Sequence, residues 1–137
     1  MKITYATESD YEYIREHDRH LIATMILKKI ESKEIYILRD QDDENIGWLR
    51  YGYFWDSIPF MNLIWIDGRY RGRGLGKRTV LQWEDEMKQQ GFESVMTSTQ
   101  SDEDSQRFYR KLGYRDAGCL VLETQPLEII LMKSLLR

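Results

Sequence analysis

Hydrophobic residues recur along the chain at two different spacings, which predict both helices and strands. Val80, Trp83 and Met87 fall on one face of a predicted helix from about 75 to 90. The run Phe60–Ile66 is nearly continuous, as in a strand that is covered on both faces and therefore central in its sheet. The remaining pattern predicts strands at 2–5, 35–39, 46–55, 94–98, 114–122 and 127–133, and helices between 11 and 32 and at 101–112.

Length and composition indicate one globular domain spanning residues 1–137, large enough to bury roughly two-thirds of its unfolded surface. The net charge of -3 argues against a partner nucleic acid, because neutralising phosphates requires a concentrated basic face. Cys119 is the single cysteine and no apolar signal segment opens the chain, so we expect a cytoplasmic protein. No run approaches the roughly 20 apolar residues of a membrane span, so we expect no membrane partner.

One basic, glycine-rich segment interrupts this acidic composition. Arg71-Gly72-Arg73-Gly74-Leu75-Gly76 lies between the strand 60–66 and the helix 75–90, and Lys77 follows it. Such a strand-to-helix loop points backbone N–H groups at an anion, and glycines let the backbone approach closely. The arginine and lysine side chains add charge-assisted hydrogen bonds. The segment therefore predicts a diphosphate site, and the alternative is a tight glycine turn with solvated arginines.

Two other phosphate-binding loops do not fit these residues. A Walker loop requires Gly-Lys-Ser/Thr with another glycine five residues earlier, whereas Arg78 follows Gly76 and Lys77, and Arg71 holds the earlier position. The dinucleotide fingerprint requires a third glycine where Lys77 stands. Both spacings disfavour a general nucleotide-phosphate binder.

Two motifs together resemble those of the GNAT superfamily of N-acetyltransferases. Arg71, Gly74 and Gly76 match the family's Arg/Gln-x-x-Gly-x-Gly/Ala pattern at a strand-to-helix junction. Downstream, the segment 102–114 is similar to Asn-x-x-Ala-x-x-Phe/Leu-Tyr-x-Lys-x-Gly-Phe, with Asp and Ser in place of the Asn and Ala. With the order of elements, the resemblance covers nearly the whole chain, although the first 35 residues match in element order alone.

This resemblance implies an α+β fold, with a mixed, mostly antiparallel sheet of about seven strands flanked by helices and a splayed central strand pair. It implies acetyl-CoA as the acetyl donor, no metal, and a small-molecule or peptide amine as the acceptor. The pantetheine arm would pair with backbone where the strands near 61–67 and 94–99 diverge, and the oxyanion donor would be a main-chain N–H near Ile66 or Asp67. The cofactor-binding residues implied are Ile66, Asp67, Arg71, Gly72, Arg73, Gly74, Leu75, Gly76, Lys77, Ser98, Thr99 and Ser105.

Tyr109 is the predicted catalytic acid. In a helix, Ser105 and Tyr109 share one face while Phe108 and Leu112 share another, so one face can pack and the other can address the cofactor. A phenol with a reference pKa of about 10 is protonated at neutral pH and can supply a proton to the departing thiolate of CoA. The alternative is a tyrosine buried for packing.

No residue stands out as the general base. Asp67 and Glu123 are candidates, although a structural or solvated carboxylate is the commoner role. Cys119 is expected to be a small buried hydrophobe, which favours direct transfer in a ternary complex over a covalent acetyl-enzyme. The aromatic residues at 51, 53 and 55 share one face of a predicted strand, where packing against a helix is commoner than an acceptor pocket.

The sequence leaves the acceptor and the oligomeric state open. An antibiotic, a polyamine, an amino acid, a ribosomal N-terminus or a lysine side chain would all suit this scaffold. Exposed strands near the C-terminus would allow a homodimer. The alternative function is a non-catalytic CoA-binding module used for sensing or protein assembly.

Overall fold

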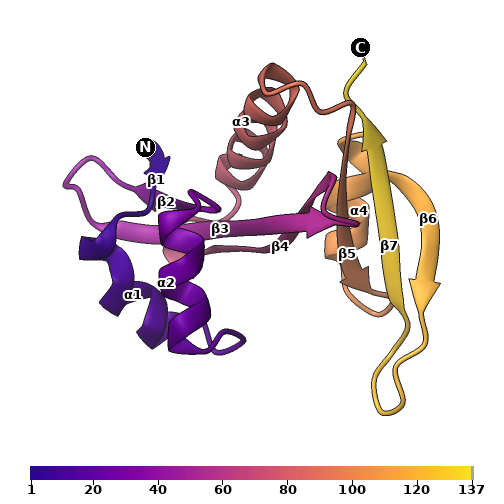
Figure 1. The fold of residues 1–137 in the computed structure, drawn as a ribbon, viewed down its shortest axis with the longest axis horizontal. Coiled ribbons are helices and arrows are strands. Elements are labelled where there is room, and N and C mark those ends of the chain that lie inside the picture. The colour runs from indigo at the N-terminus through magenta and orange to yellow at the C-terminus, as the bar shows by residue number, and fades with distance from the viewer. Residues whose placement is uncertain (137) are drawn as a thin grey trace. The chain divides into compact units, whose positions relative to one another are not determined.

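A computed structural model describes residues 1–136 as one seven-stranded sheet with helices (Figure 1). The sheet order is β1-β2-β3-β4-β5-β7-β6, and β4 and β5 are parallel whereas the pairs β1–β2, β2–β3, β5–β7 and β6–β7 are antiparallel. This arrangement confirms the expected fold class. The strands are β1 (Lys2–Tyr5), β2 (Ile35–Arg39), β3 (Asn45–Phe54), β4 (Ile58–Ile66), β5 (Ser94–Gln100), β6 (Arg115–Leu120) and β7 (Glu128–Ser134). The helices are α1 (Tyr11–His17), α2 (Ala23–Glu31), α3 (Leu75–Gln89) and α4 (Ser105–Lys111), with 3₁₀ helices η1 (Glu8–Asp10) and η2 (Gly68–Tyr70).

The chain forms two compact units, each built from two of its segments. The first unit holds Met1–Tyr51 and Leu63–Thr79, and the second holds Gly52–Asn62 and the chain from Val80 onward. The glycine-rich loop therefore belongs to the first unit and Tyr109 to the second.

The core of the first unit is formed by helices α1 and α2 with the sheet. In α2, Ile26 and Ile30 lie four residues apart and are both buried. They belong to the same core cluster as Ile14 of α1, Ile37 of β2 and Trp48 of β3. Residues at this spacing share one face of a helix, so the apolar stripes of both helices are removed from water.

Glycine is required at position 47, where β3 and β4 approach closely. A Cβ atom on Gly47 would lie 2.3 Å from the carbonyl oxygen of Trp65. The preceding residue, Ile46, accepts a hydrogen bond of 2.8 Å from the N–H of Asp67, just beyond the end of β4. This contact fixes where the strand gives way to the loop.

The core of the second unit is covered by α3, and its apolar stripe is as predicted. Val80, Trp83 and Met87 are each fully buried. The adjacent Glu84 accepts hydrogen bonds from the hydroxyl of Tyr114 at 2.9 Å and from Nζ of Lys133 on β7 at 2.6 Å. These contacts hold α3 on the face of the second unit's sheet that carries Lys133.

Two predictions about individual strands are corrected. β4 is central in the sheet order, but it is not covered on both faces, because Asn62 is exposed and most other residues of the strand are only partly buried. Cys119 lies exposed on the edge strand β6, every residue of which is exposed, so it is not a buried hydrophobe.

The aromatic residues at 51, 53 and 55 do not share one environment. Tyr51 is buried, Tyr53 contacts the ring of Phe92 at a centroid distance of 5.7 Å, and Trp55 is 78% exposed. Trp55 and Asp56 have φ values of 55° and 56°, so β3 ends before Trp55 in a turn. The expectation of shared packing against a helix is therefore wrong for Trp55.

A buried ion pair connects the segment after α1 to β3 in the first unit. Oδ2 of Asp18 accepts hydrogen bonds from Nε of Arg50 at 2.6 Å and from Nε1 of Trp48 at 3.2 Å, while Oδ1 accepts from the N–H of His20 at 3.1 Å. Burial opposes ionisation of Asp18, but the hydrogen bond and charge of Arg50, with the other donors, outweigh it and lower the pKa of Asp18 below its ordinary 3.8.

We expect Asp18→Ala to destabilise the protein by about 3 kcal/mol, because it leaves the guanidinium of Arg50 buried without a partner. Since the folded pKa of Asp18 is lowered, its contribution to stability is present above the unfolded pKa of 3.8 and is lost as the pH falls through the folded value. Urea unfolding at a series of acidic pH values measures both effects. The variant should show a smaller loss of stability with acid than the wild type.

The matched control is Glu12→Gln, which removes the exposed Arg15–Glu12 pair at 3.8 Å. Exposed pairs contribute little, so its unfolding free energy should equal that of the wild type within error. Equal stabilities for Asp18→Ala and Glu12→Gln would contradict the assigned role of the buried pair.

Candidate functional site

The glycine-rich loop joins η2 to α3 in the first unit. Gly72 and Gly74 have φ values of 75° and 77°, a region that residues with a Cβ rarely adopt. The first helical hydrogen bond of α3 runs from the N–H of Arg78 to the carbonyl of Gly74 at 3.1 Å. The amides of Leu75, Gly76 and Lys77 therefore belong to the first turn, where backbone N–H groups have no carbonyl one turn earlier to accept from them. This geometry can bind an anion.

Three basic side chains of the loop are exposed: Arg71, Arg73 and Lys77. Nε of Arg71 donates to the carbonyl of Ile66 at 2.8 Å, and its guanidinium lies 5.9 Å from the ring centroid of Trp65. One nitrogen of Arg71 thus anchors the side chain to the end of β4. The loop brings together the predicted residues from Ile66 to Lys77 within the first unit.

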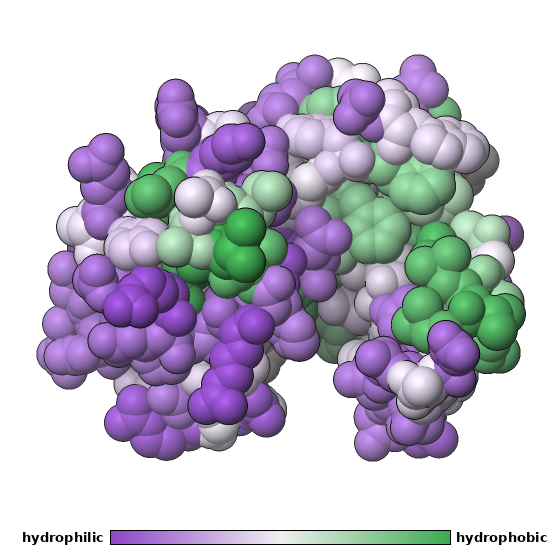
Figure 2. All heavy atoms as spheres, turned by 60° about the horizontal axis from the view of Figure 1, so that its bottom comes forward, coloured by the Kyte–Doolittle hydropathy of each residue, from purple (hydrophilic) through white to green (hydrophobic). Residues whose placement is uncertain are grey.

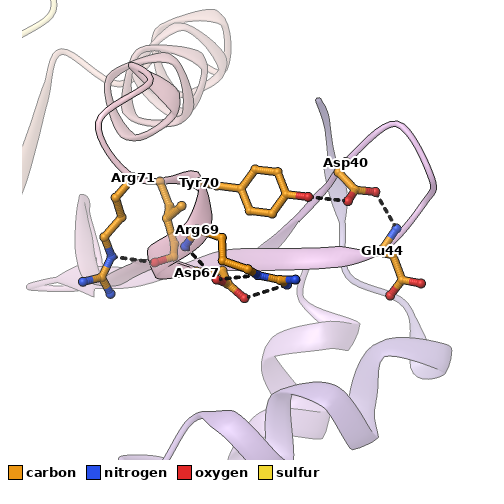
Figure 3. Close-up of polar contacts among 7 residues, drawn as sticks. Asp40, Glu44, Asp67, Arg69, Tyr70 and Arg71 are labelled. Carbon is orange, nitrogen blue, oxygen red and sulfur yellow. Dashed lines mark hydrogen bonds and ion pairs between the residues drawn. The ribbon is translucent and has the colours of Figure 1, made fainter.

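Tyr70 of η2 connects this loop to the turn between β2 and β3 (Figure 3). Its hydroxyl donates to Oδ2 of Asp40 at 2.7 Å, and Oδ1 of Asp40 accepts from the N–H of Glu44 at 3.0 Å. The Tyr70 hydrogen bond is the main reason that the pKa of Asp40 is lowered, and the same bond raises the pKa of Tyr70. The guanidinium groups of Arg69 and Arg73 lie 5.7 Å and 5.2 Å from the Tyr70 ring centroid.

Sequence reasoning missed Tyr70. Its partner Asp40 is 30 residues away, and no local spacing links the two. The signal that could have found it is a tyrosine set between two arginines of a loop, where an aromatic ring can stack on guanidinium groups.

Asp67 is a structural carboxylate that begins η2. It accepts from the N–H of Arg69 at 2.9 Å and forms an ion pair with NH2 of Arg69 at 3.1 Å (Figure 3). The side-chain and backbone hydrogen bonds of Arg69 lower the pKa of Asp67, which makes it a poor general base. Its own N–H already donates to the carbonyl of Ile46, so this amide is engaged within the structure, and the N–H of Ile66 stays the predicted oxyanion donor.

In the second unit, β4 and β5 pair over a short stretch. The parallel register joins Phe60 to Met96 and Met61 to Thr97, and the hydroxyl of Thr97 donates to the carbonyl of Met61 at 3.0 Å. No further pair is present among the described residues, although β5 continues to Gln100. The paired backbone therefore opens at Asn62 and Ser98, the fork that a splayed strand pair predicts.

The predicted residues of β5 fall on two faces of the strand. The hydroxyls of Thr99 and Ser105 lie 2.6 Å apart, so these two predicted residues come together. Successive strand residues point to opposite faces, so Ser98 lies on the other face from Thr99. Ser98 is thus separated from the Thr99–Ser105 pair.

Tyr109 is the most buried residue of α4, with 6% of its surface exposed. Burial raises its pKa to about 12, although an interaction with the Thr97 side chain lowers it. The prediction placed Phe108 and Leu112 on the packing face of α4. In the structure Tyr109 is the buried residue, and Phe108 and Leu112 are only partly buried. The phenol keeps its proton at neutral pH, so it can donate but not accept one.

The chain matches a known protein family over most of its length. Residues 2–114 match the model of the acetyltransferase (GNAT) family. The chain belongs to this family. The match spans both the loop at 71–77 and the helix that carries Tyr109, and it ends at Tyr114. No curated protein matches the chain by sequence.

Solved acetyltransferase structures share the fold, two of them over nearly the whole chain. Ard1 from Thermoplasma volcanium has a TM-score of 0.83 at 16% identity, covering 99% of this chain and 98% of that one. A GNAT-family acetyltransferase from Bacillus cereus ATCC 10987 has a TM-score of 0.78 at 22% identity, covering 99% and 98%. A candidate streptothricin acetyltransferase from Bacillus anthracis str. Ames, solved in complex with acetyl coenzyme A, has a TM-score of 0.66 at 24% identity, covering 73% and 61%.

None of the helices in residues 1–136 is long and apolar enough to cross a membrane. In the same residues, no group of three or more His, Cys, Asp or Glu side chains is placed to hold a metal ion.

We expect Tyr70→Phe to loosen the loop, because it removes the hydrogen bond to Asp40 while keeping the ring beside the arginines. Hydrogen exchange of the amides in 68–77 should become faster than in the wild type. The peptide covering α4 serves as an internal control and should exchange at its wild-type rate. Unchanged exchange in 68–77 would show that Tyr70 does not hold the loop.

Proposed function

We propose that this chain is an N-acetyltransferase that moves an acetyl group from acetyl-CoA to a primary amine by direct transfer in a ternary complex. The observation that carries the proposal is the loop of the first unit, whose positive-φ glycines lead into the first turn of α3, ahead of its first helical hydrogen bond. Membership of the GNAT family supports acetyl-CoA as the ligand of that loop.

In the proposed binding mode, the diphosphate of acetyl-CoA accepts hydrogen bonds from the amides of Leu75, Gly76 and Lys77. The exposed side chains of Arg71, Arg73 and Lys77 add charge. Gly72 and Gly74 keep the backbone free of Cβ atoms at the point of closest approach. Ser98, Thr99 and Ser105 are assigned to the pantetheine arm, and the pairing of Thr99 with Ser105 supports a shared role for those two.

The proposed reaction forms one amide bond and breaks one thioester bond. The neutral amine nitrogen attacks the thioester carbonyl carbon, and the N–H of Ile66 donates to the oxyanion that develops. The carbon–sulfur bond breaks, and the phenol of Tyr109 gives its proton to the departing thiolate. The amine nitrogen loses one proton to solvent, and solvent returns a proton to Tyr109. The products are an amide and CoA.

The second candidate function is a non-catalytic CoA-binding module. The observation that favours it is the state of Asp67, which is held by Arg69 and has a lowered pKa, so this candidate base does not serve. Glu123, the other candidate, lies exposed in the loop between β6 and β7. A module would bind acetyl-CoA as tightly as an enzyme and release no CoA in the presence of amines.

We expect acetyl-CoA to raise the Tm of the wild type and to leave that of Gly74→Glu unchanged. Binding at about one hundred times Kd contributes roughly 2.7 kcal/mol of stability. Glutamate at a φ of 77° strains the loop and sets a carboxylate beside the diphosphate. Differential scanning fluorimetry with and without acetyl-CoA measures the shift.

The matched control is Gly91→Glu, which makes the same change at a φ of 99° beyond the end of α3, where a Cβ would meet no atom within 4 Å. It should lose some stability but keep the full acetyl-CoA shift. The diphosphate site is wrongly assigned if Gly74→Glu keeps the shift as well.

We expect Tyr109→Phe to lower kcat by about a hundredfold while the Kd for acetyl-CoA changes little, because the acid acts only as the thiolate departs. Since the pKa of Tyr109 is about 12, the wild-type rate should not decline through loss of this proton until the pH nears that value. Tyr13→Phe is the control, because burial also raises the pKa of Tyr13 to about 12 in the first unit. Equal kcat values for both variants would remove the acid role of Tyr109.

A further inference from the structure

The second unit contains a pocket of 570 Å³ beside the fork between β4 and β5. Its floor includes Phe60, Met96 and Met132, which lie side by side because Phe60 pairs with Met96 and Met96 pairs with Met132. Tyr53 of β3 and Trp55 of the β3–β4 connection also line it. This volume lies in the range of pockets that hold small ligands.

The floor lies on the face of the sheet opposite to α3 and α4 of the same unit. Lys133 contacts α3 and Thr97 interacts with Tyr109 of α4, whereas Met96 and Met132 are the adjacent residues in their strands and point the other way. Figure 2 shows hydrophobic surface, in green, gathered over the C-terminal strands at the right of the view. The pocket is therefore bounded by aromatic and aliphatic side chains on a sheet face that these two helices leave uncovered.

No charged side chain of residues 1–136 lines this pocket. Its polar side chains include Asn62 and Ser98, which are the first residues beyond the last paired rung of β4 and β5. The polar end of the pocket thus coincides with the fork, where the backbone of the two strands is no longer paired. An acceptor seated with its apolar body on Phe60 and Met96 would present its amine at that fork.

We propose that the pocket binds the acceptor and selects an amine with one positive charge and an aromatic or branched aliphatic body. This inference rests on the proposed acetyl transfer, whose acceptor it names by class. An apolar body of this kind gains by burial against Trp55, Phe60 and Met132. A polyamine or aminoglycoside would bring further ammonium groups into a pocket that has no carboxylate to pair with them, which is costly.

The uncharged lining would also let the acceptor amine lose its proton without a general base. Burial in apolar surroundings disfavours the charged form of an amine and lowers its pKa. An ammonium group that enters this pocket therefore releases its proton to water more readily, which yields the neutral nucleophile that the reaction needs. A carboxylate base at Asp67 or Glu123 is not required.

The first test compares three amines with the wild-type protein at saturating acetyl-CoA, following CoA release at neutral pH. Phenethylamine has one charge and an aromatic body, propylamine has one charge and a small body, and spermidine has several charges. We expect kcat/KM for phenethylamine to exceed those for propylamine and spermidine by about tenfold or more. A value for spermidine that equals or exceeds that for phenethylamine would overturn the inference.

The second test changes the pocket. Ala117→Asp sets a carboxylate in the lining from the exposed strand β6, and it should lower the phenethylamine-to-spermidine ratio of kcat/KM several-fold. The matched control is Val121→Asp, which adds the same charge at a residue that is 83% exposed and outside the lining. That variant should keep the wild-type ratio, and equal ratios in the two variants would contradict the assignment.

Two measurements separate this inference from the proposed function. If no amine releases CoA and acetyl-CoA does not raise the Tm, the proposed function fails. If acetyl-CoA raises the Tm but no amine reacts, calorimetric titration of phenethylamine into the CoA-saturated protein decides. Phenethylamine binding that is weaker in Trp55→Ala than in the wild type supports the pocket, and absence of phenethylamine binding overturns the inference.

Analytical ultracentrifugation tests whether a second copy of the chain covers this face. A dimer that dissociates in Trp55→Ala would show that it does, and would also overturn the inference.

Discussion

The hydrogen bonds of Asp67 determine where β4 ends and how the glycine-rich loop begins. Its N–H donates to Ile46 of β3, which fixes the end of the strand, and its carboxylate accepts from Arg69, which starts η2. Tyr70 then joins η2 to Asp40, 30 residues earlier in the chain. Gly72 and Gly74 follow with positive φ values, and the first helical hydrogen bond of α3 then runs from Arg78 to Gly74.

This arrangement supports the proposed anion site in a protein that is acidic overall. The net charge is -3, yet the basic side chains of the loop are gathered within ten residues. Arg69 forms an ion pair with Asp67, whereas Arg71 is anchored through Nε to the carbonyl of Ile66 and its side chain remains exposed. In the proposed site, local geometry and not overall charge would set the attraction for a diphosphate.

Much of the fold and part of the site could be predicted from sequence because they depend on local spacing. The stripe Val80, Trp83 and Met87 and the strand-to-helix position of the glycines are features of neighbouring residues. The burial of Tyr109 was one of two alternatives that the sequence left open, because it depends on the distant Thr97 and on how α4 packs. The exposure of Trp55 was missed for a similar reason, since a positive-φ turn ends β3 one residue earlier than its hydrophobic pattern indicates.

The proposed reaction is acetyl transfer from acetyl-CoA to an amine without a covalent acetyl-enzyme. The most direct measurement is mass spectrometry of one reaction that contains the protein, acetyl-CoA with a deuterated acetyl group, and phenethylamine. We predict deuterated N-acetylphenethylamine and CoA in equal amounts, with the protein mass unchanged. Labelled acetyl-CoA that persists while bound to the protein, across a broad panel of amines, would contradict acetyl transfer. An acetyl label retained on the protein would contradict the direct route.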